Sequence, residues 1–327
     1  MSSVLTTWAD RVVDRLGDRA LPWTTSQSAR VTGRLAREAE RRRVAALGDS
    51  DWVDWAYLQV FHRGADDAGR THQINQLRRG TTREGMLDVL RSSPEALAGD
   101  TPRKATEVFH GGRMTWTRSM PRARRILDLG GTSLGSPLGS LIVMGYPYDF
   151  DELVIIDLPS DDRHALYQVD ENSDLISDRG PVRYLFRSMV DLDDLADGSF
   201  DLIVSGQTFE HITQQEGGLL LTHIRRLLAP GGALALDTPN RRLTEIECEL
   251  LGTDFINPDH KIEYTHPQLM ALFAEHGLDV LRAQGIGYMP KSVGTRIWDL
   301  QELIEHPGLY DAVEDCYTLA YLVTRAD

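Results

Sequence analysis

The sequence of 327 residues predicts an α/β fold, in which a doubly wound sheet over residues 121–327 follows a helical domain over residues 1–120. Two observations carry this prediction. Up to about residue 120 the apolar residues recur at helical spacing, and no segment shows convincing strand alternation. After Pro121, short apolar runs alternate with amphipathic segments, which is typical of a parallel sheet covered by helices.

Several helices are expected in the first domain. Residues 29–47 predict a helix dense in arginine, which we interpret as a charged face in contact with water. Asp51 is the expected N-cap of the next helix, whose Trp52, Trp55 and Phe61 share one apolar face and belong to the core. A turn and short helices complete the domain, at residues 64–69, 71–77, 83–90 and 92–96.

Seven strands are expected in the second domain, because seven short apolar runs are separated by turns or amphipathic segments. They lie at residues 125–129, 153–157, 182–186, 201–205, 233–237, 280–286 and 317–324. Seven strands suit one doubly wound sheet.

The first domain also carries a short series of motifs. Between residues 55 and 97 stand an aromatic-x-x-hydrophobic pattern, a D-x-x-G turn, an L-x-x-G-x-(S/T)-R segment and an S-x-E helix start, seen as AYLQVFHRGADDAG, LRRGTTR and SSPEA. This series resembles a small helical repeat module of undefined activity that is related to phycobilisome linker domains. In bacteria such modules resemble attachments of surface-glycan enzymes and secreted adhesins, so the resemblance implies a carbohydrate context.

The first two strands expected in the second domain end in acidic residues. The segment RRILDLGGTSLGSPLG places Asp128 at the end of the first strand and a glycine-rich turn directly after it, where a ligand can lie against the backbone. The next strand, ELVIID, ends in Asp157, whose carboxylate can accept both hydroxyls of a ribose. This pair fits either a dinucleotide or S-adenosylmethionine.

The segments that follow decide between these two cofactors. MVDLDDLADGSFDLIVSGQTFEHI combines an acidic residue, a turn, a strand and an E-H-I segment, and LLAPGGALALDTPN comes after it. The linked series, from Arg124 to the last residue, resembles the class I S-adenosylmethionine-dependent methyltransferases. The resemblance implies a Rossmann-like sheet of seven strands, parallel except for one, with S-adenosylmethionine as the cofactor and methyl transfer as the reaction.

The resemblance also assigns residues to the cofactor. They are Asp128, Gly130 and Gly131 for the methionine part, Asp157 for the ribose, Leu158, Val190, Asp191 and Leu192 for the adenine, and Ser205 and Gly206 beside the reacting methyl group. The turn departs from the family's D-x-G-x-G-x-G pattern, because Thr132 replaces the second glycine and the third is displaced to Gly135.

Transfer of a methyl group to a hydroxyl requires a base for the proton and an aligned acceptor. We predict His260 as this base, with Glu263 and Asp237 as partners or alternative bases. His211, in the FEHI segment, is either a second candidate base or part of the scaffold. No tight acidic pair is present, so no metal is expected, although Asp237, Glu210 and His211 are conceivable metal ligands.

Composition limits the classes of binding partner and the cellular location that we expect for the protein. The net charge of −14 repels a phosphate backbone, so nucleic acid is not an expected substrate. The sequence has no apolar run of about 18 residues and no signal-peptide pattern. Its two cysteines have no metal-ligand spacing, so we expect a cytoplasmic protein without a membrane span.

The expected function is O-methylation of a hydroxyl on a sugar or glycan. Three alternatives stay open: O-methylation of a small secondary metabolite such as a phenol or polyketide, a nicotinamide-dependent oxidoreductase, and a non-catalytic scaffold of glycan machinery. The lack of G-x-G-x-x-G argues against the oxidoreductase, and the presence of Asp128, Asp157 and Asp191 argues against the scaffold. The acceptor is therefore a small molecule or a glycan, and the sequence leaves the oligomeric state undetermined.

Overall fold

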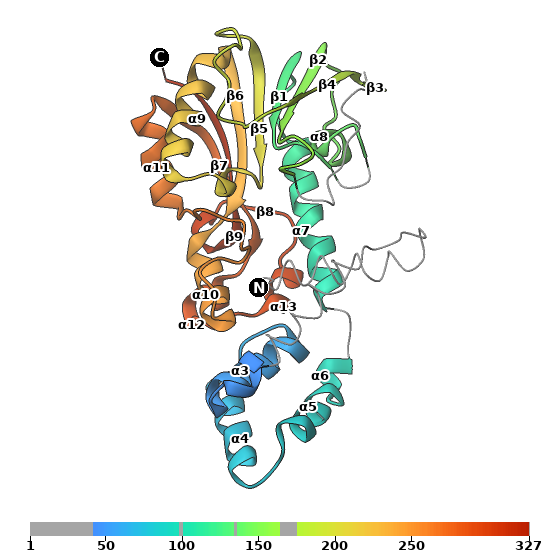
Figure 1. Cartoon of the computed structure of the whole chain (residues 1–327), viewed down its shortest axis with the longest axis vertical. Helices are drawn as coiled ribbons and strands as arrows, with labels where there is room; N and C mark the ends of the chain where they lie inside the picture. The colour runs from blue at the N-terminus through green and yellow to red at the C-terminus, as the bar shows by residue number, and fades with distance from the viewer. Residues whose placement is uncertain (1–41, 98–100, 134–135, 164–174, 327) are drawn as a thin grey trace. The chain divides into compact units, whose positions relative to one another are not determined.

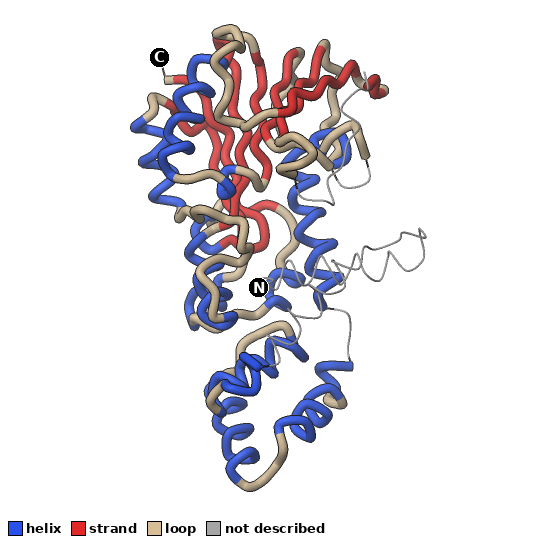
Figure 2. The backbone as a smooth tube through the Cα atoms, viewed as in Figure 1, coloured by secondary structure: helices blue, strands red, loops and turns tan. Residues whose placement is uncertain are grey.

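The computed structural model describes residues 42–97, 101–133, 136–163 and 175–326 (Figures 1 and 2). Most of the helix expected at residues 29–47 lies outside this part of the chain, as does Gly135.

The chain divides into two units. One takes Met1–Glu107, Thr244–Pro258 and Met289–Glu305, and the other takes Val108–Leu243, Asp259–Tyr288 and His306–Asp327. The division differs from the predicted boundary after residue 120, because helix α7 (Thr101–Arg118) continues from one unit into the other. The first unit also takes in two segments that were predicted as parts of the second domain.

The described residues of the first unit are helical. Besides the start of α7, its helices are α3 (Asp49–Phe61), α4 (Asp67–Arg78), α5 (Arg83–Arg91), α6 (Pro94–Leu97), most of α10 (Arg241–Leu251), α12 (Pro290–Thr295) and α13 (Leu300–Glu305). Trp52 and Phe61 are buried in its core as predicted, and Trp55 packs against that core. The predicted N-cap is wrong, because Gly48 precedes α3 and Asp51 lies in its first turn, where a negative charge is favourable.

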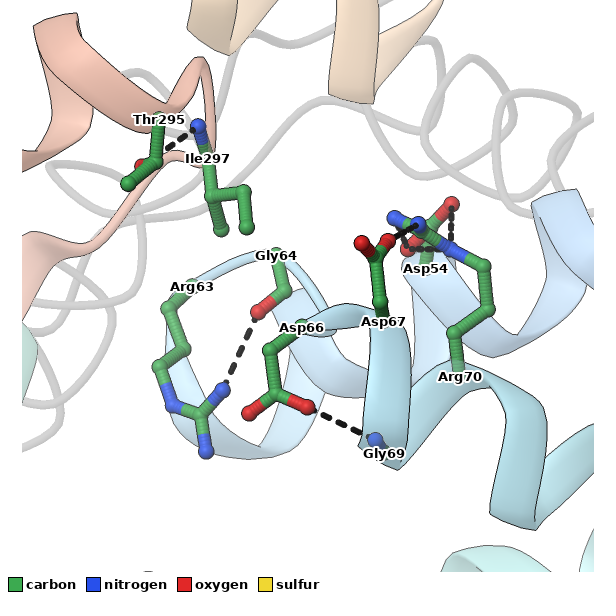
Figure 3. A network of polar contacts seen from close by, with 9 residues as sticks. All are labelled: Asp54, Arg63, Gly64, Asp66, Asp67, Gly69, Arg70, Thr295 and Ile297. Carbon is green, nitrogen blue, oxygen red and sulfur yellow. Dashed lines mark hydrogen bonds and ion pairs between the residues drawn. The ribbon is translucent and has the colours of Figure 1, made fainter.

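The D-x-x-G motif of the first unit forms the start of α4 (Figure 3). Asp66 is the N-cap, and its Oδ1 accepts a hydrogen bond of 2.7 Å from the Gly69 amide. A Cβ at Gly69 would lie 2.7 Å from the hydroxyl of Tyr57, so the site favours glycine. The next residue, Arg70, pairs with Asp54 of α3 at 2.8 Å. The motif therefore fixes α4 against α3.

The second unit is built on a nine-stranded sheet in the order β3-β4-β2-β1-β5-β6-β9-β7-β8. The seven predicted strands are present as β1 (Arg125–Leu129), β2 (Glu152–Asp157), β4 (Gly180–Phe186), β5 (Phe200–Gly206), β6 (Leu228–Pro239), β7 (Leu278–Tyr288) and β9 (Cys316–Arg325). The prediction missed β3 (Leu175–Ser177) and β8 (Leu309–Tyr310), which have three and two residues and are too short to show alternation.

Strand direction determines where a ligand can bind. The strands from β4 to β6 run parallel, and β9 is antiparallel to β6 and β7. This confirms the predicted Rossmann-like sheet with one reversed strand among the seven. The chain passes outward from β1 through β2 to β4 and then returns to β5 on the other side of β1. Such a reversal opens a crevice at the carboxyl ends of neighbouring strands, where ligands of α/β sheets bind.

Helices cover both faces of this sheet (Figure 1). They are the end of α7, α8 (Ser140–Val143), α9 (Gln214–Leu227) and α11 (His266–Glu275), with the single turns η1 (Phe209–His211) and η2 (Val313–Asp315). Leu127 and Leu129 of β1 belong to the core that contains α9 and α11, whereas Ile126 belongs to the core that contains α7 and α8. Alternation along the strand places Asp128 on the same face as Ile126. No helix in the described ranges is both long and apolar enough to cross a membrane.

Candidate functional site

The crevice where the strand order reverses contains the predicted glycine turn. Gly130 and Gly131 directly follow β1, while Ser205 and Gly206 end the neighbouring strand β5. Leu129 is the register partner of Ser205. The two segments therefore lie next to each other at the carboxyl edge of the sheet.

The turn after β1 has no room for side chains. Gly130 has a φ of +69°, and a Cβ there would lie 2.4 Å from Cγ2 of Thr208. A Cβ on Gly131 would lie 2.2 Å from Oδ2 of Asp128. The turn is tied to β2, because the Gly130 amide donates to the Ile156 carbonyl at 2.7 Å. The turn thus requires both glycines, because a side chain at Gly131 would clash with the Asp128 carboxylate.

Asp128 is a buried carboxylate, 1% exposed. It accepts a hydrogen bond of 3.3 Å from Ser140 Oγ and another from the Leu141 amide. Burial raises the pKa of Asp128 to about 7, the Asp157 charge adds to the increase, and Arg113 opposes it. The charged form of such a group is stabilised by a cationic partner, such as the ammonium group of a methionine.

Asp157 ends β2 and contacts the turn after β1. Its Oδ2 accepts a hydrogen bond of 3.2 Å from the Thr132 amide, and its Oδ1 accepts one of 2.8 Å from the Leu158 amide. A carboxylate has about four lone-pair positions, so each oxygen can still accept from a ribose hydroxyl. Thr132 takes part through its backbone amide, which every residue except proline provides, so its presence in place of glycine preserves this contact.

The predicted adenine contacts differ in their surroundings. Leu158 is 41% exposed, and Asp191 is exposed in the turn that follows β4. Val190 is half-buried, whereas Leu192 is fully buried in the core that contains α9. Leu192 therefore packs in the interior, and Leu158 and Val190 are the apolar candidates with exposed surface.

The end of β5 is held by a residue that the sequence did not identify. Ser205 is completely buried, and its Oγ lies 2.8 Å from Oγ1 of Thr208. The Thr208 hydroxyl also donates to the Leu129 carbonyl at 3.0 Å. Thr208 therefore links the ends of β1 and β5. In the sequence, the only feature that marks this residue is its position directly before the FEHI segment.

Arg113 of α7 is a second residue that the sequence did not identify. Its Nε pairs with Oδ2 of Asp237 at 3.0 Å, and the Gln207 side-chain amide donates to the same oxygen at 3.0 Å. A Cβ on Gly206 would lie 2.9 Å from Nη2 of Arg113. Asp237, predicted as a base or its partner, is thus held in a buried ion pair. No motif marks Arg113, because it lies in a helix before the first strand.

The predicted acceptor residues meet beyond the ends of β5 and β6. Glu210 and His211 belong to η1, and His260 and Glu263 come from the segment before α11. The Lys261 amide donates to the Glu210 carbonyl at 2.8 Å and joins the two segments. Nδ1 of His260 lies 2.7 Å from Oε1 of Glu263, and its Nε2 lies 4.0 Å from Oε1 of Glu210. We call these four residues the Glu210–Glu263 cluster.

Burial shifts the proton affinities in the Glu210–Glu263 cluster. Glu210 is 1% exposed, and its Oε2 accepts a hydrogen bond of 2.9 Å from Thr238 Oγ1. Burial raises the pKa of Glu210 to about 7, while the nearby His260 opposes the increase. Burial, assisted by His260, lowers the pKa of His211 to about 4. At neutral pH His211 is therefore a neutral imidazole.

The residues in the crevice fit S-adenosylmethionine. Two carboxylates, Asp128 and Asp157, suit an ammonium group and a pair of ribose hydroxyls, and Gly131 avoids a side chain that would clash with the Asp128 carboxylate. A dinucleotide places its pyrophosphate at the N-terminus of the helix after the glycine turn. Here that helix is α8, which has four residues. Its dipole is correspondingly small, and the two carboxylates would repel a pyrophosphate.

Comparison with protein families gives two matches. Residues 152–236 match a family described as a methyltransferase domain. Residues 35–99 match a family described as a domain of unknown function, DUF4214. A search of curated proteins gave no match. The second match covers the segment with the linker-like motifs and assigns no activity to it, so its relation to phycobilisome linkers stays a prediction.

Solved structures that are similar to this chain include three proteins described as methyltransferases. A putative methyltransferase complexed with the Trm112 methyltransferase activator of Haloferax volcanii is 15% identical, covers 69% of this chain and 94% of its own, and gives a TM-score of 0.46. A possible histamine N-methyltransferase of Thermotoga maritima is 16% identical, with coverages of 67% and 90% and a TM-score of 0.47. An O-methyltransferase family protein of Burkholderia thailandensis is 16% identical, with coverages of 79% and 71% and a TM-score of 0.41.

Proposed function

Since this chain is an S-adenosylmethionine-dependent methyltransferase with S-adenosylmethionine as its cofactor, we propose that it methylates a hydroxyl group of a sugar or glycan. The observation that carries the proposal is the buried pair of His260 and Glu263, whose Nδ1 and Oε1 are 2.7 Å apart. A methyl group on a sulfonium is already activated, so the protein's main chemical task is to remove a proton from a weakly acidic acceptor. A histidine oriented by a carboxylate supplies a base of this kind.

The crevice residues hold the cofactor in this proposal. Asp128 accepts hydrogen bonds from the ammonium group, and Asp157 accepts them from the two ribose hydroxyls. Ser205 and Gly206 border the methionine part, and Asp191 accepts from the adenine amino group. When bound, S-adenosylmethionine supplies the methyl group and leaves as S-adenosylhomocysteine.

The proton is handled by His260. Its Nε2 takes the hydroxyl proton while the acceptor oxygen forms its bond to the methyl carbon and the electrons of the broken carbon–sulfur bond pass to sulfur. Glu263 stabilises the resulting imidazolium through Nδ1. Asp237 is engaged by Arg113 and Gln207, so we assign it a positioning role in place of the predicted role as a base.

The carbohydrate class of the acceptor is supported by the helical module of the first unit, whose motif series resembles modules found with surface-glycan enzymes. The test is incubation of the purified protein with S-adenosylmethionine labelled in the methyl group and matched panels of glycosides, phenols and polyketides. Label in glycosides supports the proposal. Label confined to phenols or polyketides would reject the carbohydrate class and retain the hydroxyl chemistry.

The base is tested with His260→Gln and Glu263→Gln. We expect the first to lower kcat by about 100-fold or more, which is the usual contribution of a general base, and to leave S-adenosylhomocysteine binding unchanged. His276→Gln is the matched control, because His276 contacts the Leu272 carbonyl on α11 and lies outside the cluster. Full activity of His260→Gln would show that another group takes the proton.

A further inference from the structure

Three side chains of the Glu210–Glu263 cluster bring their potential ligand atoms close together. One carboxylate oxygen of Glu210, one ring nitrogen of His211 and one of His260 all lie within 4.8 Å of one another. The rings of His211 and His260 are nearly perpendicular, at 85° with centroids 4.9 Å apart. Perpendicular rings can direct one nitrogen each toward a single atom between them, whereas stacked rings cannot.

Each of the three side chains is also oriented by a hydrogen bond at another of its polar atoms. Thr238 donates to Oε2 of Glu210 at 2.9 Å, and Glu263 lies 2.7 Å from Nδ1 of His260. The Asp259 backbone accepts a hydrogen bond from His211. Histidines that bind metals almost always use the second ring nitrogen in this way, with a carboxylate or a backbone carbonyl as partner. These contacts engage Oε2 of Glu210 and Nδ1 of His260, and they leave Oε1 of Glu210 and Nε2 of His260, which are 4.0 Å apart, as the potential ligand atoms.

The charges point to a cation. The side chains of Glu210 and Glu263 are 1% and 0% exposed, and Arg241 approaches Oε2 of Glu263 at 3.5 Å. The oxygens of Glu210 instead face Thr238 and His260, which are not fixed positive charges. A buried carboxylate without a positive partner is costly, and a bound cation removes that cost.

We propose that Glu210, His211 and His260 bind a divalent transition-metal ion such as Mn²⁺, Co²⁺ or Zn²⁺. Two imidazoles and one carboxylate favour these ions over Mg²⁺ and Ca²⁺, which prefer oxygen ligands. Three protein ligands leave coordination positions for an oxygen of the acceptor. His211 is half-buried, so the cluster is accessible on that side. This inference revises the prediction that no metal is needed.

The inference rests on the proposed function for the position of the acceptor, and it changes the task of His260. The cation makes a coordinated hydroxyl more acidic, so that its proton passes to solvent before the oxygen attacks the methyl carbon. In the metal-bound enzyme His260 is then a ligand, and Glu263 orients it. In the ion-free enzyme His260 is the base, so the metal-bound and ion-free enzymes differ in the group that accepts the hydroxyl proton.

The test is direct titration of tag-free, chelator-treated full-length protein with Mn²⁺, followed by electron paramagnetic resonance of free Mn²⁺, and with Co²⁺, followed by absorption. We expect one ion per chain. His211→Asn, His260→Gln and Glu210→Gln should each weaken binding by tenfold or more, and Thr238→Val by about tenfold. His276→Gln should bind like wild type. Circular dichroism and S-adenosylhomocysteine binding verify that each variant is folded.

The outcomes separate this inference from the proposed function. No binding of either ion at millimolar concentration, or binding that persists in folded His211→Asn and His260→Gln, would overturn the metal site. Chelator-treated enzyme that methylates a glycoside at the full rate would overturn the role of the ion and retain His260 as the base. Binding that depends on the three ligands, together with no methylation of any hydroxyl, would support the site and reject the proposed function.

Discussion

Replacement of Asp128 by asparagine should change the pH dependence of stability. The pKa of this carboxyl group is raised from 3.8 to about 7, mainly by burial. The folded chain therefore retains a proton that the unfolded chain has lost between these two values. The stabilisation from Asp128 is complete below pH 3.8 and is lost as the pH rises to about 7. Asparagine cannot ionise, so Asp128→Asn lacks this loss.

The size of the effect follows from the two pKa values. Between pH 5 and pH 8 the wild type should lose about 3 kcal/mol relative to Asp128→Asn, because each pH unit between the two pKa values contributes about 1.4 kcal/mol. For a domain of this size that difference corresponds to roughly 6 to 12 °C in the thermal midpoint. Near-UV circular dichroism of both proteins at the two pH values measures it. Other groups titrate in both proteins, so the quantity to compare is the difference between them.

Two further measurements sharpen this test. Asp279→Asn, at an exposed position of β7, should behave like wild type at both pH values. Saturating S-adenosylhomocysteine should narrow the difference between wild type and Asp128→Asn, because its ammonium group offsets the buried charge. If Asp128→Asn and wild type change equally between pH 5 and pH 8, the argument that burial keeps Asp128 protonated is refuted.

Three stability predictions follow from local geometry. Gly130→Ala combines a positive φ with a Cβ contact of 2.4 Å and should cost about 3 kcal/mol in denaturant unfolding, whereas Gly231→Ala, with a similar φ and open space, should cost about 1 kcal/mol. Thr213→Ala removes the capping box of α9 and should cost about 1 kcal/mol, while the exposed Thr222→Ala on the same helix should be near neutral. Glu302→Gln weakens a buried acceptor of two α12 amides and should cost about 2 kcal/mol, seen as faster hydrogen exchange in residues 289–305, and an unchanged rate there would contradict this role.

The residues that we propose for the cofactor could be chosen from the sequence because their signals are local. Asp128 is the penultimate residue of β1 and Asp157 is the last residue of β2, and a parallel sheet places the ends of neighbouring strands on one edge. The glycines follow the first strand directly, so a short motif describes their environment. The prediction for Leu192 is the exception, since its neighbours Val190 and Asp191 are accessible while Leu192 itself enters the core.

The contacts that were missed depend on tertiary structure. Arg113 reaches Asp237 from a helix that precedes the sheet, and no spacing in the sequence connects the two residues. The short edge strands β3 and β8 form by pairing with longer neighbours and carry no period of their own. Residues 244–258 and 289–305 join the first unit from far along the sequence, and no local pattern marks such an association.

Asp237 and His260, to which we assign a positioning role and the role of the base, differ in their surroundings. Oδ2 of Asp237, on β6, accepts hydrogen bonds from Arg113 and Gln207, both at 3.0 Å, so this oxygen already has two donors. His260 is held at one nitrogen by Glu263 and directs the other toward Glu210 at 4.0 Å. That separation is too long for a hydrogen bond and leaves Nε2 as the group that can take a proton or a metal ion. We therefore propose the Glu210–Glu263 cluster as the site of the chemistry, with the acceptor between this cluster and the end of β5.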